Sequence, residues 1–585
     1  MPEYTLVLLD VGAIQEYIFG SNHLAQNIGA SEIVARVTSE WVVTTLRHDL
    51  TVATNVTWDE TQGVIYSEKS LKDGLDAELV YEGGGTAMLL CADKDVATRF
   101  IRAITLTALK RARGLELVAI QDTFEWTTAS LAQHHQRLRG QLAMRKLNHR
   151  LSTPLVGLGV TARCVFTGLP TIGWDNDEKL VGREAAGKAA AIGEDAKRIS
   201  AVVADKLRAE DRGKERLHKL LPQVRQRGFE FIYDFDEFGE RGEMSYIAVI
   251  HADGNKMGQR FEGINDAFDH PDADGSYANT NRDYVNAVRA LSQAIKRKAR
   301  QALNATVDYL LASLGPDFTF GGVVSTPIRE RKTERVLLLP FRPIVFGGDD
   351  ATFVSDGRLG LALAAYYLRA LEHGPLLPSS EQNGGPPAEA TPSWGGPLYA
   401  RAGVAIVKTH FPFARAYDLA DTLADRAKEE IDQLETDGEE TATVMDWHFS
   451  TTGVIRDLAD IRAQDYKVTK SQPVLMRPLR LTAPQGRREW RTWDTFTDLV
   501  AAFQADPWSE RRNKLKALRQ ALLQREDGVR QFLANYRMTQ LPPITGQPDM
   551  QRTGWQSGFC GYLDALEALD FFASLEPVSA ATEVT

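Results

Sequence analysis

The chain has 585 residues, of which 43% are hydrophobic and 25% are charged, and its net charge is −10. This length exceeds a single hydrophobic core and predicts three or four domains, at roughly 100–200 residues each. The acidic balance argues against broad non-specific binding of nucleic acid, which depends on Lys and Arg neutralising phosphates. Three cysteines are too few for a disulfide framework or a four-Cys zinc site in one chain.

The N-terminus has no basic region followed by a long apolar run. No stretch reaches the roughly 18 consecutive apolar residues that a membrane helix needs. The sequence therefore predicts a cytoplasmic protein without a membrane partner.

Elements of the first third follow an order of strand, helix, hairpin, helix and strand. The clearest segments are strand-like at residues 4–9, 87–91 and 115–120, and helical at 24–46 and 96–109. The same order returns later in the chain. It begins with a strand at 246–250 and a long helix in which Val288, Leu291, Ile295, Ala299 and Leu303 recur at helical spacing.

The hairpin around Asp349 continues this second unit, followed by segments that read as a helix at 359–371, a strand at 402–407 and an amphipathic helix at 414–434. We therefore expect an α+β protein with two ferredoxin-like βαββαβ units of the polymerase-palm or nucleotide-cyclase type. The predicted domains are a first palm at 1–165, a helical linker region at 166–242, a second palm at 243–480 and a helical C-terminal domain at 481–585. Within the linker region, residues 184–221 are predicted to be helical.

The most informative motif is the turn of the second hairpin, Phe346-Gly-Gly-Asp-Asp-Ala351. Gly347 and Gly348 permit backbone angles and close approaches that side chains forbid. Asp349 and Asp350 offer the hard oxygen ligands that Mg²⁺ takes together with substrate phosphates. The pattern indicates metal-dependent chemistry on a nucleotide.

A third carboxylate comes from the strand that runs beside this hairpin in the predicted topology. Asp253 follows the strand at 246–250, and Gly254 and Gly258 leave room for a nucleotide. Alone, Gly-Gly-Asp-Asp is equally well interpreted as a polar hairpin turn. The position of Asp253 favours a metal site, because two-metal phosphoryl transfer draws carboxylates from neighbouring strands.

We therefore expect Asp253, Asp349 and Asp350 to be the catalytic metal ligands for two Mg²⁺ or Mn²⁺ ions with a nucleoside triphosphate. Cations are also needed for the distal phosphates, and Lys256 and Lys428 are the candidates, with Lys408 a weaker one. The full set of expected nucleotide-binding residues is Gly254, Asn255, Lys256, Gly258, Gly347, Gly348, Lys428, Ser21 and Asn22.

The first hairpin keeps the glycines but not the acids. Its turn reads Glu82-Gly-Gly-Gly-Thr86, so both carboxylates after the glycines are missing. The second unit is expected to be catalytic and the first degenerate.

Four motifs, in order, resemble the large polymerase-like subunit of type III CRISPR effectors, the Cas-ten or Cmr-two family. They are Ile14-Gln-Glu-Tyr-Ile-Phe-Gly-Ser-Asn22, Tyr246-Ile-Ala-Val-Ile-His-Ala-Asp-Gly-Asn-Lys-Met-Gly258, the Phe-Gly-Gly-Asp-Asp turn, and Arg401-Ala-Gly-Val-Ala-Ile-Val-Lys-Thr-His-Phe-Pro412. The resemblance implies two packed palms, a helical C-terminal domain, and synthesis of cyclic oligoadenylate from ATP in the second palm. It also implies that Ser21 and Asn22 help to hold the acceptor nucleotide.

The chain departs from the family pattern at two places. It starts directly at the first palm, without the histidine-aspartate nuclease domain of many members, so a minimal form is expected. Cys164 stands alone where the family has a Cys-x-x-Cys pair, so no structural zinc is expected.

The leading hypothesis is a nucleotidyltransferase in CRISPR-type antiviral defence that converts ATP or another nucleoside triphosphate to a cyclic or linear oligonucleotide. Its expected partners are nucleoside triphosphates, and also CRISPR effector subunits with guide and target RNA. The alternative is a non-catalytic nucleotide-binding scaffold or sensor subunit of an RNA-guided effector complex.

Overall fold

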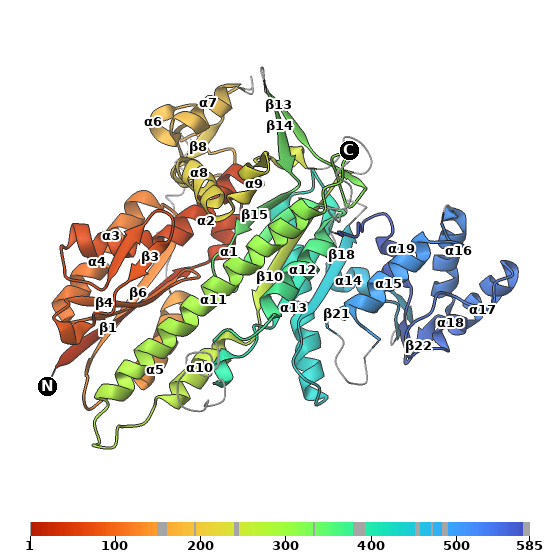
Figure 1. The fold of residues 1–585 in the computed structure, drawn as a ribbon. Coiled ribbons are helices and arrows are strands. Elements are labelled where there is room, and N and C mark those ends of the chain that lie inside the picture. The colour runs from red at the N-terminus through yellow and green to blue at the C-terminus, as the bar shows by residue number, and fades with distance from the viewer. Residues whose placement is uncertain are drawn as a thin grey trace, which may run out of the picture.

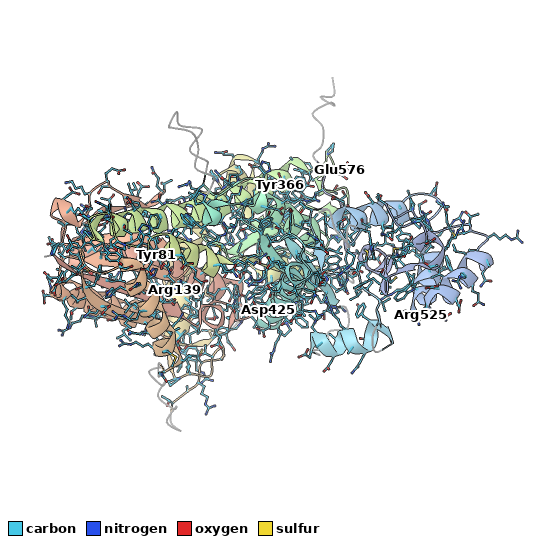
Figure 2. The ribbon with its side chains drawn as sticks, turned by 90° about the horizontal axis from the view of Figure 1, so that it is seen from below. Tyr81, Arg139, Tyr366, Asp425, Arg525 and Glu576 are labelled. Atoms are coloured by element: carbon cyan, nitrogen blue, oxygen red, sulfur yellow. The ribbon has the colours of Figure 1, made fainter. Side chains whose placement is uncertain are left out.

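A computed structural model describes residues 2–148, 161–191, 195–238, 245–331, 334–377, 392–450, 457–469, 472–482, 490–509 and 511–576. The chain forms a mixed α+β structure in which the N-terminal sheet, a central sheet and a C-terminal group of helices follow one another (Figure 1). Turned by 90°, Figure 2 shows the same order, with Tyr81 and Arg139 in the N-terminal part, Asp425 in the middle and Arg525 in the C-terminal part.

The first sheet has four antiparallel strands in the order β4-β5-β1-β6. Its central strand β1 (Glu3–Gly12) is flanked by β5 (Thr86–Cys91) and β6 (Glu116–Glu125), and β4 (Ala77–Gly83) lies outside β5. Alternate residues of β1 point to opposite faces and enter separate cores. Helix α5 (Leu131–Leu147) packs on one face, and α2 (Leu24–Val37) and α4 (Lys94–Arg111) belong to the core of the other.

The second sheet repeats this order and extends it. Strand β10 (Tyr246–Gly254) lies between β16 (Ala351–Asp356) and β17 (Ala400–Lys408), and β15 (Phe341–Val345) lies outside β16. Two further strands, β18 (Val444–Ser450) and β21 (Leu479–Arg480), continue the sheet beyond β17. The run of β10 from Ile247 to Ile250 is buried on both faces, as expected for a strand covered by helices on each side.

Helices cover both faces of the second sheet. Helices α11 (Ala278–Ala312) and α12 (Gly360–Glu372) pack on one face, in the core that contains Ile250 and Phe353. Helix α13 (Phe413–Thr436) packs on the other face, with Val249 and Val354.

Helix α11 connects the two sheets. With 35 residues at 1.5 Å each it is about 52 Å long. Near its start, Arg282 and Arg289 form ion pairs of 2.6 and 2.8 Å with Glu78 of β4, a carboxylate with no exposed side-chain surface. Losing one partner of a buried ion pair is costly, so these contacts fix the first sheet against the helix that carries the second.

The predicted helix over 184–221 is wrong in one respect. Helix α7 (Arg183–Ala191) and helix α8 (Ala201–Leu220) are separate, and a short strand β8 (Arg198–Ser200) precedes α8. Ser200 caps the N-terminus of α8, because its side chain accepts a hydrogen bond from the Val203 backbone amide. This capping hydrogen bond is the reason that Ser is favoured at helix starts.

The apolar run at 336–339 and the apolar residues at 344–346 together predict the first strand of the second hairpin, but the structure separates the two runs. Residues 336–339 lie in β14 (Glu334–Leu339), which pairs with β13 (Ile328–Arg331) and β9 (Phe229–Phe231) in a separate sheet. Pro340 and the start of β15 at Phe341 separate the two runs.

The C-terminal part is mainly helical, with α15 (Trp493–Gln504), α16 (Arg512–Leu523), α17 (Arg525–Asn535), α18 (Met550–Thr553) and α19 (Leu563–Ala568), and a short hairpin of β22 (Trp555–Gln556) and β23 (Phe559–Cys560). None of the helices in the described ranges combines the length and apolar character that crossing a membrane requires.

Gly403 of β17 allows α13 to approach the second sheet closely. A Cβ atom at this position would lie 1.9 Å from the Ala420 carbonyl oxygen and 2.5 Å from the Ala424 nitrogen. We expect Gly403→Ala to lower the free energy of unfolding by about 1–3 kcal/mol, because the backbone of α13 has to shift. Urea denaturation followed by tryptophan fluorescence measures this. Gly187→Ala, where the new Cβ meets nothing, is the control, and equal midpoints for the two variants would contradict the close packing.

Candidate active site

The second hairpin turn lies beside the end of β10. Ala252 is paired with Ala351 across the two strands, so Asp253 and Gly254 are next to the turn at residues 347–350. A Cβ atom on Gly254 would lie 2.9 Å from the Asp349 Cβ, and Gly347 has a φ of +135° that side chains rarely adopt. Glycine at these two positions lets the turn fold down onto the strand end.

The two carboxyl groups of the turn are poorly solvated. Burial, and then the charge of Asp253, raise the pKa of Asp349 to about 7. Burial also raises the pKa of Asp350 to about 6; the His251 imidazole opposes this shift and Asp253 adds to it. Although 41% of the Asp350 side-chain surface is exposed, its Oδ1 atom is enclosed and has no hydrogen-bond partner in the described residues.

A partly buried arginine neutralises the third carboxylate. Arg401 lies opposite Asp253 in the pairing of β10 with β17, and its Nη2 atom is 2.5 Å from Asp253 Oδ2. The Arg401 charge also lowers the pKa of Asp349 and Asp350 against the larger effect of burial. Arg401 therefore acts as the main counter-charge of the site.

His251 bridges two carboxylates on the α13 face of the sheet. Its Nδ1 atom is 3.5 Å from Asp350 Oδ1, and its Nε2 atom is 3.4 Å from Asp421 Oδ1 on α13. The imidazole is buried and packs edge-on against the Tyr417 ring at 5.4 Å. This arrangement limits where the Asp350 side chain can turn.

Sequence reasoning missed His251, Arg401 and Asp421. A signal existed for the first two: His251 is two residues from Asp253 and shares its face of the strand, and Arg401 begins a motif whose strand pairs with β10. Asp421 lies on a helix whose placement depends on tertiary packing, so the sequence pattern did not indicate it.

The donor set fits a divalent cation chemically. Clustered carboxylates that raise one another's pKa, with one enclosed oxygen lacking a partner, are hard ligands of the kind that Mg²⁺ and Mn²⁺ prefer. In the described part of the chain, however, no three Asp, Glu, His or Cys side chains are drawn together as a coordination shell. Arg401 holds Asp253 instead, so a cation has to displace this ion pair.

The predicted residues after Asp253 lie around the start of α10 (Met257–Ala267). Asn255 is buried, and its backbone N–H donates a hydrogen bond to the Tyr399 carbonyl oxygen at 2.8 Å. Lys256 has a left-handed φ of 57° and forms an ion pair with Glu435 of α13. A Cβ on Gly258 would meet nothing within 4 Å, so space is open there.

The two other predicted lysines differ in position. Lys428 is exposed on α13 and follows Asp421 by seven residues, which places both on one face of the helix. Lys408 pairs with Tyr246 at the far end of β10, seven residues from the pairing of Arg401 with Asp253. The suggestion that Lys408 contacts the distal phosphates is therefore wrong.

Ser21 and Asn22 lie near the start of α13. The Ser21 hydroxyl donates to Gln26 at 2.9 Å, and Asn22 Oδ1 accepts from the Ala414 amide at 3.3 Å. Two residues earlier, Phe19 stacks on Tyr417 at 3.8 Å, and Tyr417 packs on His251. This loop thus supports the wall of the site through aromatic contacts.

The glycine turns of the two sheets meet. A Cβ on Gly348 would lie 4.0 Å from the Gly84 Cα, so the turn without acids packs against the turn with them. The first sheet has its own acid near the equivalent strand end, Asp10, but this carboxylate is paired with Lys146 at 2.8 Å. The acidic site is therefore confined to the second sheet.

Comparison with solved structures finds crystal structures of Csm1. A Csm1–Csm4 cassette in complex with cA3 is 13% identical, with a TM-score of 0.47 over 98% of this chain and 70% of that chain. Csm1 of T. onnurineus is also 13% identical, with a TM-score of 0.46 over 98% and 70%. The Csm1–Csm4 subcomplex of the type III-A CRISPR-Csm interference complex is 13% identical, with a TM-score of 0.47 over 97% and 70%.

These Csm1 chains are the structural neighbours of this protein. No protein-family model matches the chain, and no curated protein matches it. At 13% identity and TM-scores below 0.5, the likeness assigns no activity, and the functional conclusion rests on the residues of the site.

The raised pKa of Asp349 makes stability depend on pH. In the unfolded chain the Asp349 carboxyl has its ordinary pKa of 3.8, whereas in the folded state its pKa is about 7. The folded state therefore holds a proton that the unfolded chain has already released, so this group lowers stability as the pH rises from about 4 to 7. Above about pH 7 the loss of stability is complete. In EDTA at pH 8, Asp349→Asn is expected to raise the unfolding temperature by a few degrees, and the gain should shrink as the pH falls to 5. Asp308→Asn on the exposed side of α11 is the control. A gain that is equal at both pH values would show that Asp349 is not poorly solvated.

Arg401 competes with a cation for Asp253. Arg401→Met is expected to tighten Mn²⁺ binding about tenfold, or about 1.4 kcal/mol, because the site loses a positive charge and an ion pair that the metal must displace. The same variant should melt at a lower temperature in EDTA, since three carboxylates then lack their counter-charge. Isothermal titration with Mn²⁺ measures the first effect. The control is Arg415→Met, which replaces an exposed arginine of α13. Weaker Mn²⁺ binding would show instead that Arg401 holds Asp253 in its ligating position.

Proposed function

We propose that this chain is a metal-dependent nucleotidyltransferase that joins nucleoside triphosphates, ATP in the first instance, into a cyclic or linear oligonucleotide. The observation that carries the proposal is the meeting of Asp253, Asp349 and Asp350 at the junction of β10 with a glycine turn, where burial and mutual repulsion raise the pKa of both turn carboxyls. Such a cluster costs stability unless cations bind to it.

The three carboxylates would hold two Mg²⁺ or Mn²⁺ ions. When bound, such ions stabilise the charge that develops on the attacking and leaving oxygens of a phosphoryl transfer. Asp350 is the residue best placed to accept one, because its enclosed Oδ1 atom accepts no hydrogen bond from the described residues and lies 3.5 Å from His251 Nδ1. His251 keeps that carboxylate oriented between β10 and α13.

The glycines would form the floor on which the triphosphate lies. Gly347 and Gly348 carry no side chain over the turn, and the space at Gly258 is open. Lys428 lies on the same helix face as Asp421 with its ammonium exposed, so it is available for the distal phosphates. Lys256 can contribute once it leaves Glu435.

The strand orders support two ferredoxin-like palms as part of this proposal. Each sheet places its first strand between the third and fourth strands of a βαββαβ unit, and the glycine turns of the two units meet. A second nucleotide bound near Gly84 would thus lie across from the first, as joining two nucleotides requires. The four sequence motifs further support a role in type III CRISPR defence, with effector subunits and RNA as partners.

Incubation of the purified full chain with each nucleoside triphosphate and Mg²⁺ or Mn²⁺ tests the proposal, with products identified by mass spectrometry. We expect oligonucleotide and pyrophosphate from the unaltered chain. The Asp349→Ala, Asp350→Ala double variant should reduce the rate by at least about a thousandfold, because the metal ligands are lost. Asp308→Ala, an exposed acid on α11, is the matched control and should leave the rate unchanged.

Two results would count against catalysis. Equal rates for the double variant and the unaltered chain would remove Asp349 and Asp350 from the mechanism. Nucleotide binding without product, in the presence and absence of RNA and effector subunits, would favour the sensor or scaffold instead.

A further inference from the structure

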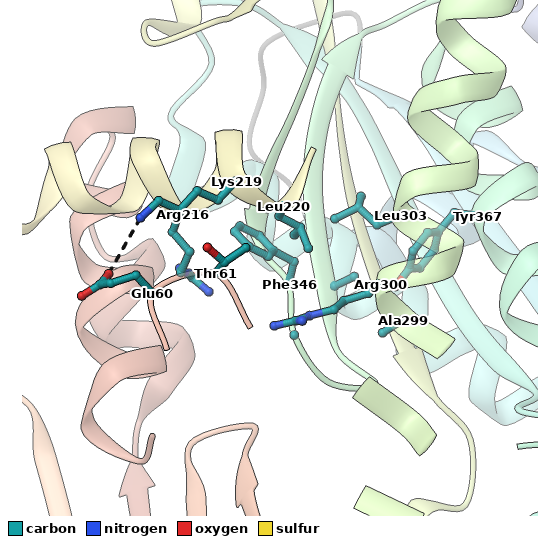
Figure 3. A pocket seen from close by; sticks show the side chains of 12 residues that line it. Glu60, Thr61, Arg216, Lys219, Leu220, Ala299, Arg300, Leu303, Phe346 and Tyr367 are labelled. Carbon is teal, nitrogen blue, oxygen red and sulfur yellow. Dashed lines mark ion pairs between the residues drawn. The ribbon is translucent and has the colours of Figure 1, made fainter. Parts of the chain in front are cut away.

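A small cavity lies behind the glycine turn, on the face of β16 away from His251. Ala351 lines the cavity and points toward α11 and α12, whereas the next residue, Thr352, contacts His251 on the α13 side. Figure 3 shows Arg300 and Leu303 of α11, Phe346 at the start of the turn, and Arg216 and Lys219 of α8 around it. The turn between β2 (Val56–Asp59) and β3 (Gly63–Tyr66), which form a separate two-stranded sheet, contributes Glu60.

The cavity walls carry more positive than negative charge. Arg216, Lys219 and Arg300 line it, and Glu60 is the one acid among its lining residues. Lys219 approaches Glu60 only to 3.9 Å, and Arg216 is paired with Glu32 outside the cavity at 2.6 Å. The guanidinium of Arg300 has no hydrogen bond or ion pair within the described residues and is directed into the space between α11 and the turn (Figure 3).

Arg300 and Lys219 are exposed, so an anion from solvent can reach both side chains. Partial burial lowers the pKa of Arg300, Glu82 opposes this, and the neighbouring Arg216 lowers it further. The charges of Arg216 and Arg300 repel each other, and a bound oxyanion replaces this repulsion with charge-assisted hydrogen bonds.

The size of the cavity limits the ligand. At about 70 Å³, and with roughly 10–15 Å³ for each water, it holds about five waters, which is roughly the five non-hydrogen atoms of one phosphate group. Phe346 and Leu303 line the cavity with apolar surface, so Arg300, which has no ion pair within the described residues, is the arginine available to an anion.

We propose that this cavity is a second phosphate site, which binds the phosphate group of a nucleotide separately from the carboxylates of the turn. The assignment to a nucleotide rests on the proposed function, whereas the binding of an oxyanion does not. Because Phe346 precedes Gly347 and Arg216 lies 4.4 Å from the centre of the Phe346 ring, an anion held by Arg216 and Arg300 would fix the start of the catalytic turn. The site thereby links α8 and the β2–β3 hairpin to the position of Asp349 and Asp350.

Isothermal titration of the full chain in EDTA tests this site, because the carboxylates then have no cations with which to bind phosphate. The probes are pyrophosphate, AMP and, as a ligand without phosphate, adenosine, all at matched ionic strength. We expect pyrophosphate and AMP to bind with submillimolar Kd and adenosine not to bind. Arg300→Met should weaken the binding of both at least tenfold, whereas Arg297→Met, an exposed arginine of α11 that does not line the cavity, should leave it unchanged.

Several outcomes would overturn the proposal. Equal binding by Arg300→Met and the unaltered chain would exclude the cavity, and Kd values of tens of millimolar would mark adventitious binding. Binding of pyrophosphate without AMP would retain a phosphate site and overturn its assignment to a nucleotide. If Arg300→Met does not fold, as judged by its unfolding temperature, Lys219→Met replaces it with the same expectation.

The Asp349→Asn, Asp350→Asn variant separates this site from the catalytic one. It should keep the binding measured in EDTA, because neither carboxylate lines the cavity. If the unaltered chain makes no oligonucleotide but binds pyrophosphate and AMP in EDTA, the proposed function is refuted and the second phosphate site is retained. Loss of EDTA-insensitive binding in this variant would show that the two sites are one.

Discussion

Repulsion among carboxylates at one strand end is the constraint on which the centre of this structure depends. Asp253, Asp349 and Asp350 are held together by backbone geometry, since the turn packs on Gly254 at a distance that a larger residue could not tolerate. Partial burial reduces the screening of these charges by water, and the pKa of both turn carboxyls rises as a result. Arg401 is the counter-charge that offsets this repulsion at Asp253, and His251 contacts Asp350.

The same constraint explains why the two sheets differ despite their common strand order. In the first sheet the turn has glycines but no acids, and Asp10 near the strand end is paired with Lys146, so no group there requires a cation. The turns nevertheless pack against each other at Gly84 and Gly348, which makes the first sheet a wall of the site. Helix α11 fixes this contact by binding Glu78 of the first sheet while packing on the second.

Charge is distributed asymmetrically across the second hairpin. The α13 face carries acids, with Asp350 and Asp421 on either side of His251. The opposite face carries Arg216, Lys219 and Arg300 around a small cavity. A triphosphate substrate combines groups that suit both faces, because it brings metal ions to the acids and bare phosphate oxygens to the cations. The glycine turn lies between these two faces, so the metal ions and the phosphate oxygens would both help to fix its position.

The sequence by itself determined the local features of this protein. Apolar periodicity indicated most strands and helices of both units, and the glycine turn with Asp349 and Asp350 was recognisable because turn chemistry depends on neighbouring residues. The repeated element order also indicated that Asp253 lies beside that turn. Only the tertiary structure decided which cations neutralise the acids, that Ser200 begins a separate helix, and that Lys408 lies at the wrong end of its strand. The cavity at Arg300 was likewise decided by packing, because its walls come from α8, α11 and two hairpins far apart in the chain, and no local pattern encodes which of them meet.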